Sequence, residues 1–143
     1  MFKTLDPDTL VSEQIAPAAV EDAKTRGVAL IINNRPEGEA EDQTPGEAIE
    51  SAAQAAGIGY VSIPVTHAGF SQAQVDAMIA ALESAGGPVL AYCRSGTRST
   101  LLWALARARM GDNPDELARK AAAAGYDVSP VRQVMDMFAA NRG

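Results

Sequence analysis

The sequence predicts an α/β fold in which helices flank a mostly parallel central sheet, with two extra helices at the C-terminal end. Apolar, strand-like runs alternate with helix-like segments as far as Met110. Several runs are continuously apolar and rich in β-branched residues, as in strands that are buried on both faces. Glycine or proline stands at most of the transitions. The 143 residues suit one compact unit, so we expect residues 1–143 to form a single domain.

The first half of the chain contains three predicted strands and two predicted helices. Weak apolar alternation indicates an edge strand, and a helix with Pro17 at its first position should end at Gly27. A second helix should begin at a capping box of Thr44 and Glu47, and Gly57 should end it. The expected strands are residues 10–15, 28–32 and 60–65.

The second half contains one predicted strand among four predicted helices. Ser71 and Gln74 form a capping box before apolar residues at helical spacing, which run to the glycine pair at 86–87. The strand, residues 88–92, is a short apolar run. Three helices remain. The first follows the turn after Cys93, contains Leu101 to Met110 and should end at Gly111, whereas the others should span residues 113–125 and 129 onward, with prolines near their starts.

Composition excludes several classes of function. Twelve basic residues against 18 acidic ones give a net charge of −6, which disfavours nucleic-acid binding. No stretch is long and apolar enough to cross a bilayer, and we find no secretory leader, so we expect a cytoplasmic protein with no membrane partner. A single cysteine allows no internal disulfide and no cysteine cluster for zinc, and we expect no metal or organic cofactor.

The loop that follows the strand at 88–92 is the candidate catalytic site. Cys93 ends the strand, and a turn containing Gly96 leads into the next helix. Helix N-termini and nearby guanidinium groups lower a thiol pKa from roughly 8.5 to about 3.5–7.5, so we expect a nucleophilic thiolate. Arg98 can present a planar fork of donors to an oxyanion. The anion-binding loop should further include Arg94, Ser95, Gly96, Thr97 and Ser99.

An isolated cysteine after a strand is commonly an inert apolar residue. Here two arginines, a glycine and two hydroxyls surround it, which an inert residue does not require.

Residues 89–99, which read VLAYCRSGTRS, resemble the active-site loop of rhodanese-type sulfurtransferases. Together with residues 33–39 (NNRPEGE) and 63–65 (IPV), they resemble still more closely the bacterial beta-lactamase-hydrolase-like family. That resemblance covers roughly residues 5–110 and implies a protein-tyrosine-phosphatase-like fold.

Two chemistries remain open for Cys93. The spacing from Cys93 to Arg98 is C-x4-R, as in rhodaneses, whereas tyrosine phosphatases have C-x5-R. Related dual-specificity phosphatases carry an acidic residue just after a segment like residues 63–65, but here Thr66-His67-Ala68-Gly69 follows. Both departures favour sulfur transfer, in which Cys93 takes a sulfane sulfur from a small anionic donor and passes it from a persulfide to a thiol acceptor.

The alternatives are a phosphatase that forms a Cys93 phosphoenzyme from a phosphate ester, and a catalytically idle module that binds an anion or a protein. His67 is a possible acid, although a loop histidine of this kind is more often simply solvated. Arg35 can reach the pocket or lie on the surface, and the acidic residues between 37 and 42 are interpreted as a solvated loop. The sequence does not decide the oligomeric state, and it leaves the C-terminal helices to cover the core or to mediate assembly.

Overall fold

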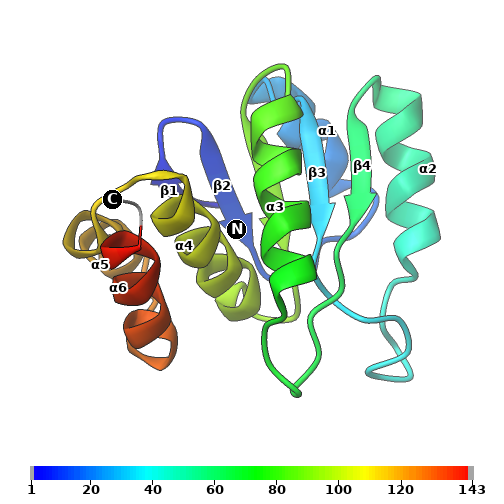
Figure 1. Cartoon of the computed structure of the whole chain (residues 1–143). Coiled ribbons are helices and arrows are strands. Elements are labelled where there is room, and N and C mark those ends of the chain that lie inside the picture. The colour runs from blue at the N-terminus through cyan, green and yellow to red at the C-terminus, as the bar shows by residue number, and fades with distance from the viewer. Residues whose placement is uncertain (1, 142–143) are drawn as a thin grey trace.

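A five-stranded mixed sheet forms the centre of the molecule in a computed structural model that describes residues 2–141. The strand order is β1-β2-β5-β3-β4; β1 and β2 pair in antiparallel fashion, and the other neighbours are parallel. The predicted α/β class with a mostly parallel sheet is therefore confirmed (Figure 1). The strands are β1 (Lys3–Asp6), β2 (Thr9–Ser12), β3 (Leu30–Asn33), β4 (Gly59–Ser62) and β5 (Val89–Tyr92).

Helices cover both faces of this sheet (Figure 1). One face packs against α1 and α2, and the other packs against α3 and α4. The last two helices lie against α4 at one side of the sheet. The helices are α1 (Ala19–Thr25), α2 (Gly46–Ala56), α3 (Gln72–Ser84), α4 (Thr97–Met110), α5 (Pro114–Ala123) and α6 (Arg132–Ala140), with a 3₁₀ turn, η1 (Ser129–Val131), before α6.

The central strands are buried on both sides, as their apolar runs predict. In β3, Ile31 contributes to the core beneath α1 and α2, whereas Ile32 contributes to the core beneath α3 and α4. Leu90 and Ala91 of β5 alternate between the two cores in the same way. Because successive strand residues point to opposite faces, a strand between two helical layers must be apolar throughout.

The C-terminal helices bury the outer side of α4. Leu102, Trp103 and Leu105 of α4 have 2% or less of their surface exposed, and they share a core with Leu117 of α5 and Met135 of α6. A helix packed between a sheet and two other helices is apolar nearly all round. The extra helices therefore cover the core of the domain, which was one of the two roles that the sequence left open.

Two features at the N-terminus differ from the expectation. The strand expected at 10–15 runs from Thr9 to Ser12, and it lies inside the sheet because β1 pairs with its outer side. The edge strand β1 was not predicted, since Lys3–Asp6 is short and has no alternating apolar pattern. Helix α1 begins at Ala19 rather than at Pro17.

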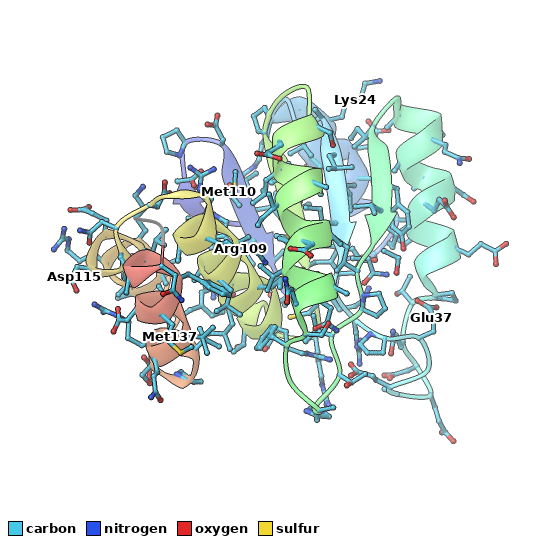
Figure 2. The ribbon with its side chains drawn as sticks, in the orientation of Figure 1. Lys24, Glu37, Arg109, Met110, Asp115 and Met137 are labelled. Carbon is cyan, nitrogen blue, oxygen red and sulfur yellow. The ribbon has the colours of Figure 1, made fainter. Side chains whose placement is uncertain are left out.

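Other boundaries also shift for identifiable reasons. β4 ends at Ser62 instead of Val65, close to Pro64, which has no N–H to donate to a ladder. The predicted capping box at Thr44 and Glu47 is wrong: α2 begins at Gly46, and the Glu37 carboxylate accepts the Gly46 N–H at 3.0 Å. Figure 2 shows Glu37 near the end of α2 where the helix begins. The last helix starts with the 3₁₀ turn η1 and becomes α-helical at Arg132.

The start of α3 and the lengths of the helices agree with the sequence analysis. The capping box of Ser71 and Gln74 before α3 is confirmed, with both reciprocal hydrogen bonds formed. Among residues 2–141, no helix is long and apolar enough to be a candidate membrane span.

Candidate active site

The loops that follow β3, β4 and β5 meet at the carboxyl edge of the sheet, at the bottom of Figure 1. Arg98, at the start of α4, donates one guanidinium hydrogen bond to the Val65 carbonyl at 2.6 Å. The same Nη1 atom lies 2.7 Å from Oε2 of Glu39, which belongs to the loop after β3. The three loops therefore converge, as is usual at the carboxyl ends of parallel strands.

Cys93 lies at the centre of this convergence. Its Sγ accepts a hydrogen bond from the Gly96 N–H at 3.1 Å, so the loop curls around the sulfur. The Cys93 amide donates to the Ser12 carbonyl at 3.4 Å, which ties the loop to the end of β2. None of the Cys93 surface is exposed. The sulfur therefore faces an inward amide at the N-terminal end of α4, and it is covered in the conformation seen here.

Gly96 makes the tight curl possible. Its φ of +92° is in the left-handed region that side-chain-bearing residues rarely adopt, and it directly precedes the first turn of α4. Tyr126, from the segment after α5, closes over the loop and donates a hydrogen bond from its hydroxyl to the Ser95 carbonyl at 3.0 Å. A Cβ atom at Gly96 would lie 2.2 Å from that hydroxyl. Position 96 therefore requires glycine for its conformation and for space.

Arg98, Glu39 and Arg35 form a partly buried ion cluster. Both Glu39 oxygens accept from Arg98, at 2.7 and 2.9 Å, and Oε1 also accepts from Arg35 Nε at 2.9 Å. Hydrogen bonds from Arg98, and then from Arg35, lower the pKa of Glu39 to about 2 against the opposing effect of burial. The pKa of Arg98 is raised, chiefly by Glu39 and in addition by the charge of Cys93. Arg98 thus interacts electrostatically with the thiol, and it is also bound to the Glu39 carboxylate, which stays ionised near neutral pH.

The other predicted site residues lie at different depths around the loop. Ser95 and Thr97 are exposed, and their hydroxyls bond to each other at 3.0 Å, whereas Ser99 is fully buried in the first turn of α4. The Arg94 side chain is exposed, and within residues 2–141 no hydrogen bond joins its guanidinium to Cys93. Its part in holding an anion stays a prediction.

Arg35 and His67, the two possible further site residues, are placed differently: the first is buried and the second is exposed. Arg35 is 5% exposed and belongs to the ion cluster, so the structure brings it next to Arg98 and Glu39 rather than leaving it on the surface. His67 is exposed on the turn after β4, and no contact described for residues 2–141 joins it to Cys93 or Arg98. Its use as an acid therefore also stays a prediction.

Sequence reasoning missed Glu39 and Tyr126. The acidic segment was interpreted as a solvated loop, and that interpretation is wrong for Glu39, which binds Arg98. Glu37 is exposed, as expected, and its carboxylate also accepts the amide at the start of α2. Only the NNRPEGE motif pointed to Glu39. Tyr126 lies 31 residues beyond the carbonyl that it binds, and no pattern in the sequence indicated it.

Comparison with known proteins identifies the family. A family model described as the phosphatase-like domain of beta-lactamase hydrolase-like proteins matches residues 1–110, which include every residue of the ion cluster and the loop. The chain belongs to this family. The match ends where α4 ends, so Tyr126 and the last two helices lie outside it.

Relatives and solved structures are consistent with this assignment. Beta-lactamase hydrolase-like proteins from Xylella fastidiosa and Agrobacterium fabrum are 36% identical over 104 residues and 40% identical over 86. These stretches cover 72% and 60% of this chain but only 24% and 20% of those proteins. The matched region is thus a fifth to a quarter of the length of these relatives.

Candidate phosphatases of known structure share the whole fold. One from Neisseria meningitidis is 36% identical with a TM-score of 0.83, covering 95% of this chain and 96% of that one. Another, from Shewanella putrefaciens, is 26% identical with a TM-score of 0.77, covering 99% and 93%. These neighbours fit the phosphatase alternative better than the sulfurtransferase function that the sequence favoured.

Proposed function

We propose that this domain is a cysteine-dependent hydrolase of phosphate esters, with Cys93 as nucleophile and Arg98 as the group that holds the phosphoryl oxygens. The observation that carries the proposal is the loop between them. The Gly96 N–H of this loop donates a hydrogen bond to Cys93 Sγ at 3.1 Å. The loop leads into α4, where the Arg98 guanidinium interacts electrostatically with the thiol. Family membership and the candidate phosphatases among the structural neighbours support phosphate as the transferred group.

The reaction has two displacement steps. The Cys93 thiolate attacks phosphorus, and the P–O bond to the alcohol or phenol breaks with the electron pair leaving on oxygen. Water then attacks the cysteinyl phosphate, which releases inorganic phosphate and restores the thiolate. Loop amides and Arg98 stabilise the charge that develops on the equatorial oxygens in both steps. The proposal needs no metal or organic cofactor.

Departure of the leaving group is the step to which the described side chains contribute least. The loop at residues 66–70 has no carboxyl group, and Glu39 cannot donate a proton near neutral pH because its pKa is about 2. Without a carboxylic acid to protonate it, departure depends on the basicity of the leaving oxygen. We therefore propose that aryl phosphates react much faster than alkyl phosphates.

Sulfane sulfur transfer is the second candidate, and two observations favour it. The loop has only four residues between Cys93 and Arg98, and sulfite leaves thiosulfate without an acid. In this reaction the thiolate attacks the outer sulfur of thiosulfate, and the S–S bond breaks with its electrons leaving on sulfite. An acceptor thiolate then attacks the outer sulfur of the Cys93 persulfide and regenerates the thiolate.

Parallel assays on one preparation separate these candidates. Para-nitrophenyl phosphate hydrolysis and thiosulfate sulfurtransfer are measured for the wild type, Cys93→Ser and Arg98→Lys, with Arg119→Lys as an exposed control. We expect phosphatase activity that Cys93→Ser abolishes, Arg98→Lys lowers by about 100-fold or more, and Arg119→Lys leaves unchanged. Intact mass after substrate treatment identifies the intermediate on Cys93.

The other outcomes each contradict the proposal. A Cys93-dependent transfer of sulfur, with one added sulfur on the protein and no phosphate hydrolysis, would establish the second candidate. Folded wild-type protein that shows neither activity but binds phosphate would indicate an anion-binding module. Activity that survives in Cys93→Ser would exclude covalent cysteine chemistry altogether.

A further inference from the structure

An open groove lies over α4 between α3 and α6, the two helices that pack on either side of it (Figure 1). Its volume is about 530 Å³, within the range of about 300–1,000 Å³ that is usual for small-molecule sites. Cys93, Arg98 and Glu39 are not among the described residues that line it, so the groove is distinct from the catalytic loop. Most of its lining is apolar and includes Phe70, Val75, Leu105, Val131, Val134 and Phe138.

The apolar lining of the groove is partly open to solvent. Val75 of α3 and Leu105 of α4 are buried members of the core, whereas Val134 of α6 is 39% exposed. A ligand with an apolar body would remove this surface from water, which favours binding in proportion to the area covered. The wall formed by α6 lies beyond residue 110, where the match to the family model ends, so the groove is not a feature of the matched region alone.

Arg109 gives the groove a charge, since among the described residues that line it Arg109 alone is ionised. Figure 2 shows it on α4, with α3 on one side and α6 on the other. Its guanidinium lies over the Phe138 ring, 5.8 Å from the centroid, and its Nη1 donates to Asp76 Oδ1 at 2.8 Å. Asp76 is exposed and does not line the groove. A guanidinium has five N–H donors and this bond uses one nitrogen, so Arg109 can bind an anionic head as well.

We propose that the groove over α4 binds a small amphiphilic anion, with its alkyl body against the apolar lining and its carboxylate on Arg109. Charge complementarity selects an anion over a neutral or cationic amphiphile, because the one ionised lining residue is a cation. The occupant is a free molecule of the size of a medium-chain fatty acid. This inference does not depend on the proposed function, since it requires neither Cys93 nor Arg98.

Titration calorimetry with decanoate as the probe tests the site, with butyrate and decanol as comparison ligands. We expect decanoate to bind at least about tenfold more tightly than butyrate, because each additional buried methylene strengthens binding. Decanol has the same chain length without the charge, and it should bind about fivefold or more weakly than decanoate, because a charge-assisted hydrogen bond to Arg109 is missing.

Substitutions on α6 and α4 locate the ligand. Val134→Trp fills the groove and should weaken decanoate binding about tenfold or more, because the added ring takes the space of the alkyl chain. Met137→Trp is the matched control, since Met137 is 55% exposed on the same helix and is not among the described lining residues. Arg109→Gln should weaken decanoate about fivefold or more and leave decanol unchanged. If Val134→Trp does not fold by circular dichroism, Val134→Asn decides, and it should weaken decanoate about threefold or more.

Three results would overturn the inference. Decanoate that does not bind, or binds no more tightly than butyrate, would show that the groove holds no alkyl chain. Equal affinities in the Val134 and Met137 variants would place any bound decanoate elsewhere. If Arg109→Gln weakens decanol as much as decanoate, Arg109 only shapes the groove and holds no anionic head. Decanoate binding to a protein that hydrolyses no phosphate ester would remove the proposed hydrolase and leave this site intact.

Discussion

Replacing Gly96 by alanine tests how the Cys93 loop is held. The residue has φ +92°, and an added Cβ would lie 2.2 Å from the Tyr126 hydroxyl and 2.9 Å from Cζ of its ring. The left-handed conformation costs a residue with a Cβ about 1–2 kcal/mol. The ring must also move away and lose its hydrogen bond to Ser95, which costs about 1–2 kcal/mol more. We expect Gly96→Ala to reduce the free energy of unfolding by about 2–4 kcal/mol.

Gly27 provides the matched control. It has a similar φ of +79°, and a Cβ there would meet no atom within 4 Å, so Gly27→Ala should cost only the conformational part, about 1–2 kcal/mol. Equilibrium urea denaturation measures both variants. In a Tyr126→Ala background, which removes the ring, the excess cost of Gly96→Ala over Gly27→Ala should vanish. If the two glycine variants are equally destabilised in the wild-type background, contact with Tyr126 does not constrain the loop.

Two further predictions concern stability. Because the folded pKa of Glu39 is about 2 and the ordinary value is 4.5, its ion pairs contribute fully above pH 4.5 and are lost as the pH falls toward 2. Between these limits the wild type should lose on the order of 2 kcal/mol more than Glu39→Gln in urea titrations; parallel curves would refute this. Ser71→Ala removes the α3 cap and should cost about 1 kcal/mol, whereas Ser84→Ala at the other end, whose hydroxyl bond is 3.4 Å long, should cost little. Equal losses would contradict the role of the cap.

Local patterns predicted most of the helices and strands. The capping box at Ser71 and the buried run before Cys93 each depend on residues within one turn or one strand, and both were located correctly. Errors arose where a distant group decided the outcome. The start of α2 is capped by Glu37, nine residues before Gly46, and nothing local to Thr44 showed that its own capping box would not form.

The choice between sulfur and phosphorus illustrates the same limit. Loop length and the missing acid are properties of the sequence, and they favour sulfur. Family and fold comparisons favour phosphate, because they weigh the whole arrangement of sheet, loop and helix. Neither the loop length nor the comparisons reveal that the Glu39 carboxylate is bound to Arg98.

By itself the sequence determined the alternation of strands and helices and the position of a cysteine between a buried strand and a helix N-terminus. Both follow from short-range periodicity and turn chemistry. Only the tertiary structure decided that Glu39, 59 residues before Arg98, occupies the guanidinium, and that Tyr126 closes over the loop from the far end of the chain. Such contacts join residues that the fold brings together, and spacing along the chain carries no record of them.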